Sequence, residues 1–173
     1  SDGQVLAEST IDEASECSAW GVSPDLRLKP EIAAPGGEVF SSIPDGAYEQ
    51  SSGTAMATPQ MAGVSTIVLQ RVQSDPLFAS MSARQKADVV QNLIMGTARP
   101  LTDAAQTTGA LYSPRKQGAG LVDALAATTS SVYPTVVGAP EQSRPKADLG
   151  DGTKGWPFDV PLHNPAGLPA TPE

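Results

Sequence analysis

The stretch from residue 51 to residue 63 constrains the fold of this 173-residue chain more than any other. It reads Ser-Ser-Gly-Thr-Ala-Met-Ala-Thr-Pro-Gln-Met-Ala-Gly, a run of small residues around a glycine and a proline. Gly53 lets the chain turn sharply without a Cβ clash, and the residues after Thr54 are predicted to enter a helix. Pro59 fits such a helix if it lies within about one turn of the start, where few N–H bonds are lost. Residue 55 is therefore expected near a helix N-terminus.

This segment resembles the nucleophile motif of the subtilisin-like serine proteases, Gly-Thr-Ser-Met-Ala-(Ser/Thr)-Pro-x-x-Ala-Gly. The one departure is Ala55, which stands where the nucleophilic serine belongs. Two upstream blocks, at 19–25 and 28–37, resemble the family's Ser-Trp-Gly and Lys-Pro-Asp-Ile-Ala-Ala-Pro-Gly stretches. Residues 112–124 resemble the block that ends the catalytic domain. Their Ser-Pro-Arg-x-Gln-Gly-Ala-Gly form is similar to the cell-envelope proteinases of Gram-positive bacteria, the lactocepin and complement-peptidase type.

The resemblance implies a Ser-His-Asp triad that hydrolyses peptide bonds, with a protein or peptide as substrate. The backbone N–H of Ala55 would contribute to the oxyanion hole, since helix N-termini favour negative charge. Gly53 and Thr54 would shape the nucleophile turn. Met56 is expected near the leaving-group side or as a core filler, and both roles are compatible. The implied location is secreted or attached to the cell surface or cell wall, in a Gram-positive bacterium.

Half of the expected machinery is not in this sequence. Subtilisin-like triads follow the order Asp, His, Ser, so the acid and the base should precede residue 55. The only histidine is His163, downstream, and it is predicted to be a surface residue of a strand or turn. The family's Asp motif, His-Gly-Thr motif and oxyanion Asn are also absent. The chain is therefore interpreted as the C-terminal part of a catalytic domain, whose partner is the missing N-terminal part.

Ala55 leaves two explanations open, a deliberate knockout of a working protease or a natural pseudoprotease that binds peptides without cleaving them. Relaxed selection usually erodes the residues around a lost nucleophile, whereas here the neighbouring motif residues are intact. That pattern favours the knockout. A third reading, an adhesive interaction fragment, has no specific feature in its support.

Composition excludes some partners. The net charge of −8 argues against nucleic acid, because no basic stripe replaces phosphate counterions. No run is apolar enough to span a membrane. The single cysteine, Cys17, is expected to be a small half-buried residue, and one Cys with one remote His makes no metal site. No cofactor is predicted for this chain, although the resemblance implies structural calcium in the intact enzyme.

The predicted fold class is α/β, the C-terminal part of a subtilisin-like parallel-sheet domain over residues 1–128. Residues 29–43 suggest a strand, a Pro-Gly-Gly turn and a second strand at 38–43, and Asp45-Gly46 marks another turn. A helix is predicted from residue 55 to about residue 72, where apolar residues on several faces indicate a largely buried helix, and Asp75-Pro76 ends it. A second helix is predicted after a capping box at residues 82–85, with apolar residues at positions 89, 90, 93 and 94, and a short third helix is predicted at 121–127. Residues 101–117 read as a long surface loop. Alternation at 132–137 and 156–163 indicates strands, and the resemblance implies that residues 129–173 begin a fibronectin type III-like β-sandwich.

Overall fold

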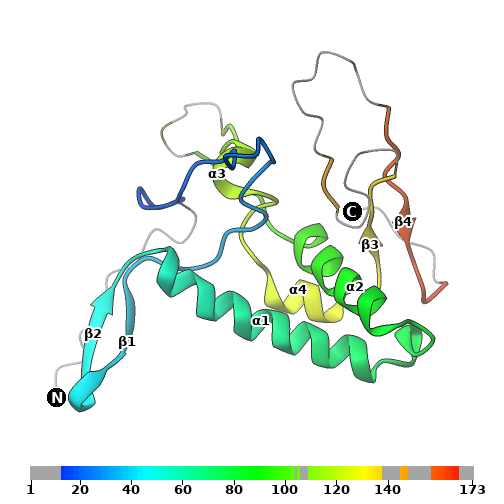
Figure 1. The fold of residues 1–173 in the computed structure, drawn as a ribbon, viewed down its shortest axis with the longest axis horizontal. Coiled ribbons are helices and arrows are strands. Elements are labelled where there is room, and N and C mark those ends of the chain that lie inside the picture. The colour runs from blue at the N-terminus through cyan, green and yellow to red at the C-terminus, as the bar shows by residue number, and fades with distance from the viewer. Residues whose placement is uncertain (1–12, 104, 106–108, 138–144, 148–156, 168–173) are drawn as a thin grey trace.

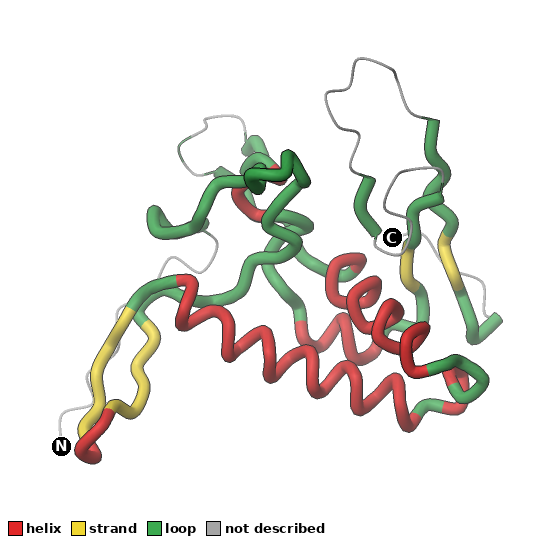
Figure 2. Tube along the Cα trace, viewed as in Figure 1, coloured by secondary structure: helices red, strands yellow, loops and turns green. Residues whose placement is uncertain are grey.

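The structure is a computed structural model that describes residues 13–103, 105, 109–137, 145–147 and 157–167. A long helix runs along one side of it, with two shorter helices packed beside its second half and a hairpin projecting before its start (Figure 1; Figure 2). The helices are α1 Thr54–Ser74, α2 Ala83–Gly96, α3 Pro114–Gln117 and α4 Ala124–Thr129. The strands are β1 Val39–Ile43, β2 Ala47–Ser51, β3 Tyr133–Pro134 and β4 Leu162–His163.

The core lies where α1, α2 and α4 meet, and its buried side chains are Val68, Val72, Phe78, Val89, Val90, Leu93, Ile94, Ala127 and Tyr133. The prediction that the first helix is largely buried is wrong. In α1 only Val68 and Val72 are buried, and Ile67 is 54% exposed. The reason is that the described elements packed against α1 are α2, α4 and the 3₁₀ turn Pro76–Phe78, which cover one of its faces.

Helix α2 confirms the predicted capping box. The Ser82 hydroxyl accepts from the N–H of Gln85, and the Gln85 side chain accepts from the N–H of Ser82. Each of these bonds satisfies an N–H that the helix itself leaves open. The four predicted apolar positions of this helix, residues 89, 90, 93 and 94, are all buried.

The second strand predicted in this segment, at residues 38–43, is confirmed as β1, which begins at Val39. Strand β1 pairs with β2 in an antiparallel hairpin in which Val39 faces Ser51 and Ile43 faces Ala47. The hairpin closes at the 3₁₀ turn Pro44–Gly46, in agreement with the turn expected at Asp45. Between residues 29 and 34 the chain forms one bridge, from Ala33 to Leu121. A proline at position 30 cannot donate a ladder hydrogen bond, which limits any longer strand there.

The segment around Leu121 differs from the predicted helix at 121–127, which begins only at Ala124. Leu121 is extended and bridges Ala33 in parallel and Arg99 in antiparallel orientation. The bridge between Ala33 and Leu121 is the parallel pairing seen among the described residues. The predicted surface loop at 101–117 is also partly wrong, because Gln117 is buried and binds the N–H of Leu101 through its side-chain oxygen at 2.6 Å.

The two C-terminal segments that were predicted as strands pair with each other. Tyr133 faces His163 in the β3–β4 pair, and Val137 bridges Asp159. Tyr133 also belongs to the core beneath α2, so the described strands pack on the preceding helices. The β-sandwich and the boundary at residue 128 remain predictions. Most of the polar run between these segments lies outside the described residues.

Candidate active site

The predicted nucleophile turn lies where strand β2 ends and α1 begins. Gly53 caps the helix, and its carbonyl oxygen accepts from the N–H groups of Met56 and Ala57 at 3.0 and 3.3 Å. On the strand side, the Ser52 hydroxyl accepts from the N–H of Glu38 at 2.8 Å. The turn is thus tied both to its own helix and to the beginning of the hairpin.

Ala55 is the second residue of α1, and it is exposed. A helix leaves its first N–H groups without acceptors among its own carbonyls, and the helix dipole places positive charge there. The N–H of Ala55 can therefore donate to an oxygen that gains negative charge. The methyl side chain itself has no atom that could attack a carbonyl. Position 55 therefore has a backbone N–H in the first turn of α1 and no nucleophilic side chain.

The glycine that this turn requires for space is Gly36, which sequence reasoning did not single out. The N–H of Gly53 donates to the carbonyl oxygen of Gly36 at 2.8 Å. A Cβ at Gly36 would lie 2.7 Å from the carbonyl oxygen of Gly53 and 3.1 Å from the Cβ of Ala57. A Cβ at Gly53 would meet only ordinary contacts, and the backbone of Gly53 is extended. The expected sharp turn at Gly53 is thus an extended entry to the helix.

Met56 is half-buried, and its sulfur lies 3.6 Å from the place where a Cβ of Gly53 would be. The thioether therefore packs against the turn that carries position 55. Thr54 is exposed, and its carbonyl oxygen accepts from the Thr58 hydroxyl at 2.9 Å. Pro59 lies inside α1, where it has no N–H to donate to the carbonyl of Ala55.

The blocks that carry the resemblance meet in space. The carbonyl oxygen of Arg115 accepts from the N–H of Gly21 at 2.7 Å, and the Arg115 Nε donates back to the carbonyl oxygen of Gly21 at 2.8 Å. Gly21 has no room for a side chain, since a Cβ would lie 1.7 Å from the Lys29 carbonyl oxygen. Further along, the Ala119 N–H donates to the carbonyl oxygen of Glu31 at 3.0 Å. The role of Arg115 was not visible in the sequence, because its contact with Gly21 joins residues 94 positions apart.

Aromatic residues flank this junction. The ammonium group of Lys116 lies 5.5 Å from the ring centroid of Trp20 and 5.1 Å from that of Tyr112. Both contacts are within cation–π range. Trp20 remains 60% exposed, so the first upstream block, at residues 19–25, presents an aromatic surface to solvent.

Strand β4, which carries His163, lies on the opposite side of Figure 1 from the start of α1. The His163 ring stacks on Tyr133 at 5.1 Å, and its Nε2 lies 2.8 Å from the Thr135 hydroxyl oxygen. It is exposed on β4, as predicted, and does not face position 55. Cys17 is exposed rather than half-buried, because it lies in a surface turn closed by the N–H of Ser18 and the carbonyl oxygen of Ser15.

The carboxylate of Asp25, in the first upstream block, interacts with its immediate sequence neighbours. The Ser23 hydroxyl donates to Asp25 at 2.5 Å, and this bond, helped by Arg27, lowers the pKa of the Asp25 carboxyl. The Asp25 side chain is exposed, and the partners described for its carboxylate are Ser23 and Arg27. Within the described part of the chain, no three His, Cys, Asp or Glu side chains gather where they could hold a metal ion.

Comparison with known proteins bears on this arrangement directly. Residues 5–120 match the model of the subtilase family. The chain belongs to the subtilase family. It is 30% identical over 166 residues to a C5a peptidase of Streptococcus pyogenes, and the match covers 96% of this chain. It is 34% identical over 150 residues to a PII-type proteinase of Lactococcus lactis subsp. cremoris, covering 83% of this chain. These findings confirm the resemblance carried by the motif blocks.

The chain corresponds to a small share of these relatives, 14% of the C5a peptidase and 8% of the PII-type proteinase. Among solved structures, the patellamide maturation protease PatA matches with 29% identity and a TM-score of 0.41. That match covers 57% of this chain and 32% of the protease. None of the described helices of this chain is both long and apolar enough to pass through a bilayer.

Proposed function

We propose that this subtilase chain is the C-terminal part of the catalytic domain of a serine endopeptidase, with alanine at the nucleophile position. The observation that carries the proposal is the position of residue 55, exposed in the first turn of α1 behind the Gly53 cap. A serine there would present its hydroxyl to solvent beside an N–H that can hold an oxyanion. The aspartate, the histidine and the second oxyanion donor would come from the preceding part of the polypeptide.

The proposed substrate is a protein or peptide, and the proposed location is outside the cell or on the surface of a Gram-positive bacterium. The names of the similar proteins, a C5a peptidase and lactococcal proteinases, support both. The chain that follows α4 is proposed to begin a fibronectin type III-like domain. Its support is the antiparallel pairing of β3 with β4.

The test compares three proteins in a fluorogenic peptide or casein assay. The 173-residue chain with Ala55→Ser should not cleave, because the base and its orienting carboxylate are absent. The same substitution in a protein that also carries the upstream region should cleave. The upstream region with alanine retained is the control, and it should be lower by about 10⁶-fold, the loss measured for the triad serine in subtilisin itself.

The second candidate function is a pseudoprotease that binds peptides without cleaving them. The single observation in its favour is Ala55, whose methyl group keeps the cleft intact and removes the reaction. It predicts that the protein with the upstream region restored binds peptide whether residue 55 is alanine or serine, and cleaves in neither case. Cleavage by the 173-residue chain alone after Ala55→Ser would contradict both candidates.

A further inference from the structure

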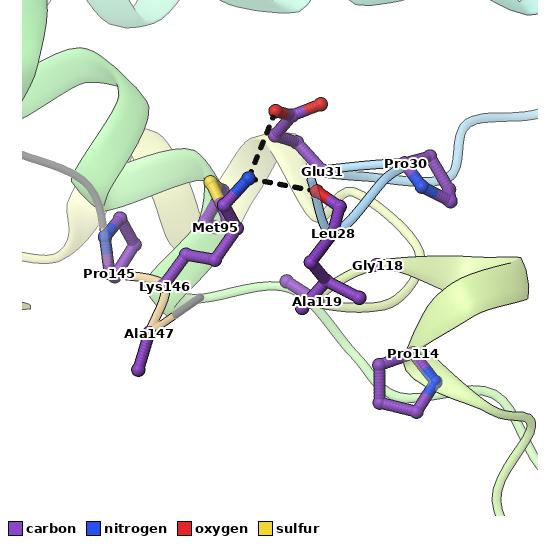
Figure 3. A pocket seen from close by; sticks show the side chains of 10 residues that line it. All are labelled: Leu28, Pro30, Glu31, Met95, Pro114, Gly118, Ala119, Pro145, Lys146 and Ala147. Atoms are coloured by element: carbon purple, nitrogen blue, oxygen red, sulfur yellow. Dashed lines mark hydrogen bonds and ion pairs between the residues drawn. The ribbon is translucent and has the colours of Figure 1, made fainter. Parts of the chain in front are cut away.

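Lys146 is buried, with 7% of its surface exposed, in a chain whose other buried polar side chains among the described residues are Asn92 and Gln117. Lysine is almost never fully buried unless it is paired. The residue lies beyond the boundary predicted at residue 128, in the short described piece 145–147. Its side chain points into a cleft beside the second motif block (Figure 3).

The ammonium group has two partners in that block. The Lys146 Nζ donates to the carbonyl oxygen of Leu28 at 2.8 Å and lies 3.5 Å from the Glu31 carboxylate. Lys29 binds the same carboxylate, so one acidic group is shared by two lysines. Removing a charge from water is costly unless the charge is paired and hydrogen-bonded. The buried ammonium group therefore stabilises conformations in which it contacts both the Leu28 carbonyl oxygen and the Glu31 carboxylate.

The other side of the same block is held by backbone. The Ala119 N–H donates to the carbonyl oxygen of Glu31 at 3.0 Å, and a Cβ at Gly118 would lie 2.3 Å from the carbonyl carbon of Glu31. The block from residue 28 to residue 31 is therefore enclosed between Lys146 and the turn after α3 (Figure 3). Met95 of α2 lines the same cleft.

The same stretch of chain leads to the nucleophile turn. Two residues after Glu31, the Ala33 N–H donates to the carbonyl oxygen of Gly120 at 2.8 Å. Three residues later, Gly36 accepts from the N–H of Gly53. A contact that holds the block at Glu31 thus restrains the segment on which the α1 entry rests.

We propose that Lys146 is a docking point that fastens the chain following residue 128 to the block at residues 28–31. The two units predicted on either side of the boundary are then joined by a buried charge contact, and the boundary does not act as a free hinge. Movement of the C-terminal segment is transmitted to Glu31 and from there toward Gly36. The inference rests on the contacts alone and holds whether or not the protein is a peptidase.

The test is amide hydrogen exchange on the full 173-residue chain carrying Lys146→Met, which keeps most of the stem and removes the charge. The amides of Ala119 and Ala33 should exchange at least about tenfold faster, equivalent to about 1.4 kcal/mol of local opening free energy. Amides in the middle of α2, such as that of Val89, should keep their rates. Lys86→Met is the matched control, because Lys86 lies on α2 away from this block, and it should leave both regions unchanged.

Two results would overturn the proposal. Unchanged exchange at Ala119 and Ala33 would show that the ammonium group does not hold the block. Equal acceleration in α2 would show that Lys146 contributes only to overall stability. If Lys146→Met does not fold, Glu31→Gln decides in its place: it leaves the bond to Leu28 and removes the ion pair, so faster exchange confined to Ala119 and Ala33 is expected, and no local change rules the docking contact out.

Discussion

At the scale of single residues, the start of α1 depends on two glycine backbones in direct contact. The N–H of Gly53 binds the carbonyl oxygen of Gly36, and the space that a side chain at Gly36 would need is taken by Gly53 and Ala57. The motif pattern alone points to Gly53 as the critical glycine. Contact between residues 17 positions apart is visible only in the folded chain, which is why Gly36 was not selected from the sequence.

Gly36→Ala should destabilise the full chain by about 1–3 kcal/mol, the usual cost of inserting an atom into a packed site. Its methyl group would press on the carbonyl oxygen of Gly53 and on Ala57. Gly37→Ala is the control, since its nearest neighbour would be the Ser15 hydroxyl oxygen at 3.5 Å. Urea unfolding measures both. Equal free energies of unfolding for the two variants would show that the turn accommodates a methyl group at position 36 without loss of stability.

Residue-level reasoning reached position 55 from the motif, and the structure places it at the helix N-terminus as predicted. Cys17 was misjudged because the composition rule that cysteine is buried cannot register a local surface turn. His163 was assigned correctly from its distance along the chain from every motif block. Assignments of this kind depend on the local sequence pattern, whereas the burial of a side chain depends on which other elements pack against it.

At the scale of elements, the start of α2 and the end of α1 could be predicted from local sequence signals, whereas the pairing of strands could not. The capping box at Ser82 and the Asp75-Pro76 stop after α1 are both present. The partner of β1 was left open, because two turn signals, at Pro35 and at Asp45, lie within one short segment. Either could close a hairpin, and the sequence does not rank them.

Ser82→Ala should destabilise the chain by about 1 kcal/mol, the typical loss when an N-cap side chain is removed. The substitution removes the bond from the Gln85 N–H to the Ser82 hydroxyl and the bond from that hydroxyl to the Gln85 side chain, and it leaves the bond from the Ser82 N–H to the Gln85 side chain. Ser80→Ala, two residues earlier and exposed, should be neutral. Thermal unfolding of the pair gives the comparison. A lower midpoint for Ser80→Ala than for Ser82→Ala would contradict the capping assignment.

At the scale of the whole molecule, one core joins the helices to the segment after residue 129. Tyr133 belongs to that core, and burial raises the pKa of its hydroxyl above the ordinary value. A raised pKa in the folded state means that the unfolded chain loses its proton first as pH rises. The stability from burying the neutral ring is therefore complete below about pH 10 and is lost above it.

The free energy of unfolding should fall as pH rises above about 10 in the unaltered chain, and the fall should be shallower in Tyr133→Phe. Tyr48→Phe is the control, because Tyr48 is 67% exposed, and it should keep the full slope. Urea titrations between pH 8 and pH 11, roughly one to two units around the reference value, provide the measurement. If Tyr133→Phe left the pH dependence of the free energy of unfolding unchanged, the Tyr133 hydroxyl would have to be exposed to water.

The central claim is that residue 55 occupies the nucleophile position of a serine peptidase, and a covalent label tests it most directly. A protein with the upstream region restored and with Ala55→Ser is treated with a fluorophosphonate, and the adduct is located by peptide mapping. The account predicts one adduct, on residue 55, and none when alanine is retained. A folded protein that stays unlabelled at residue 55, or is labelled at another serine to the same extent in both forms, would contradict it.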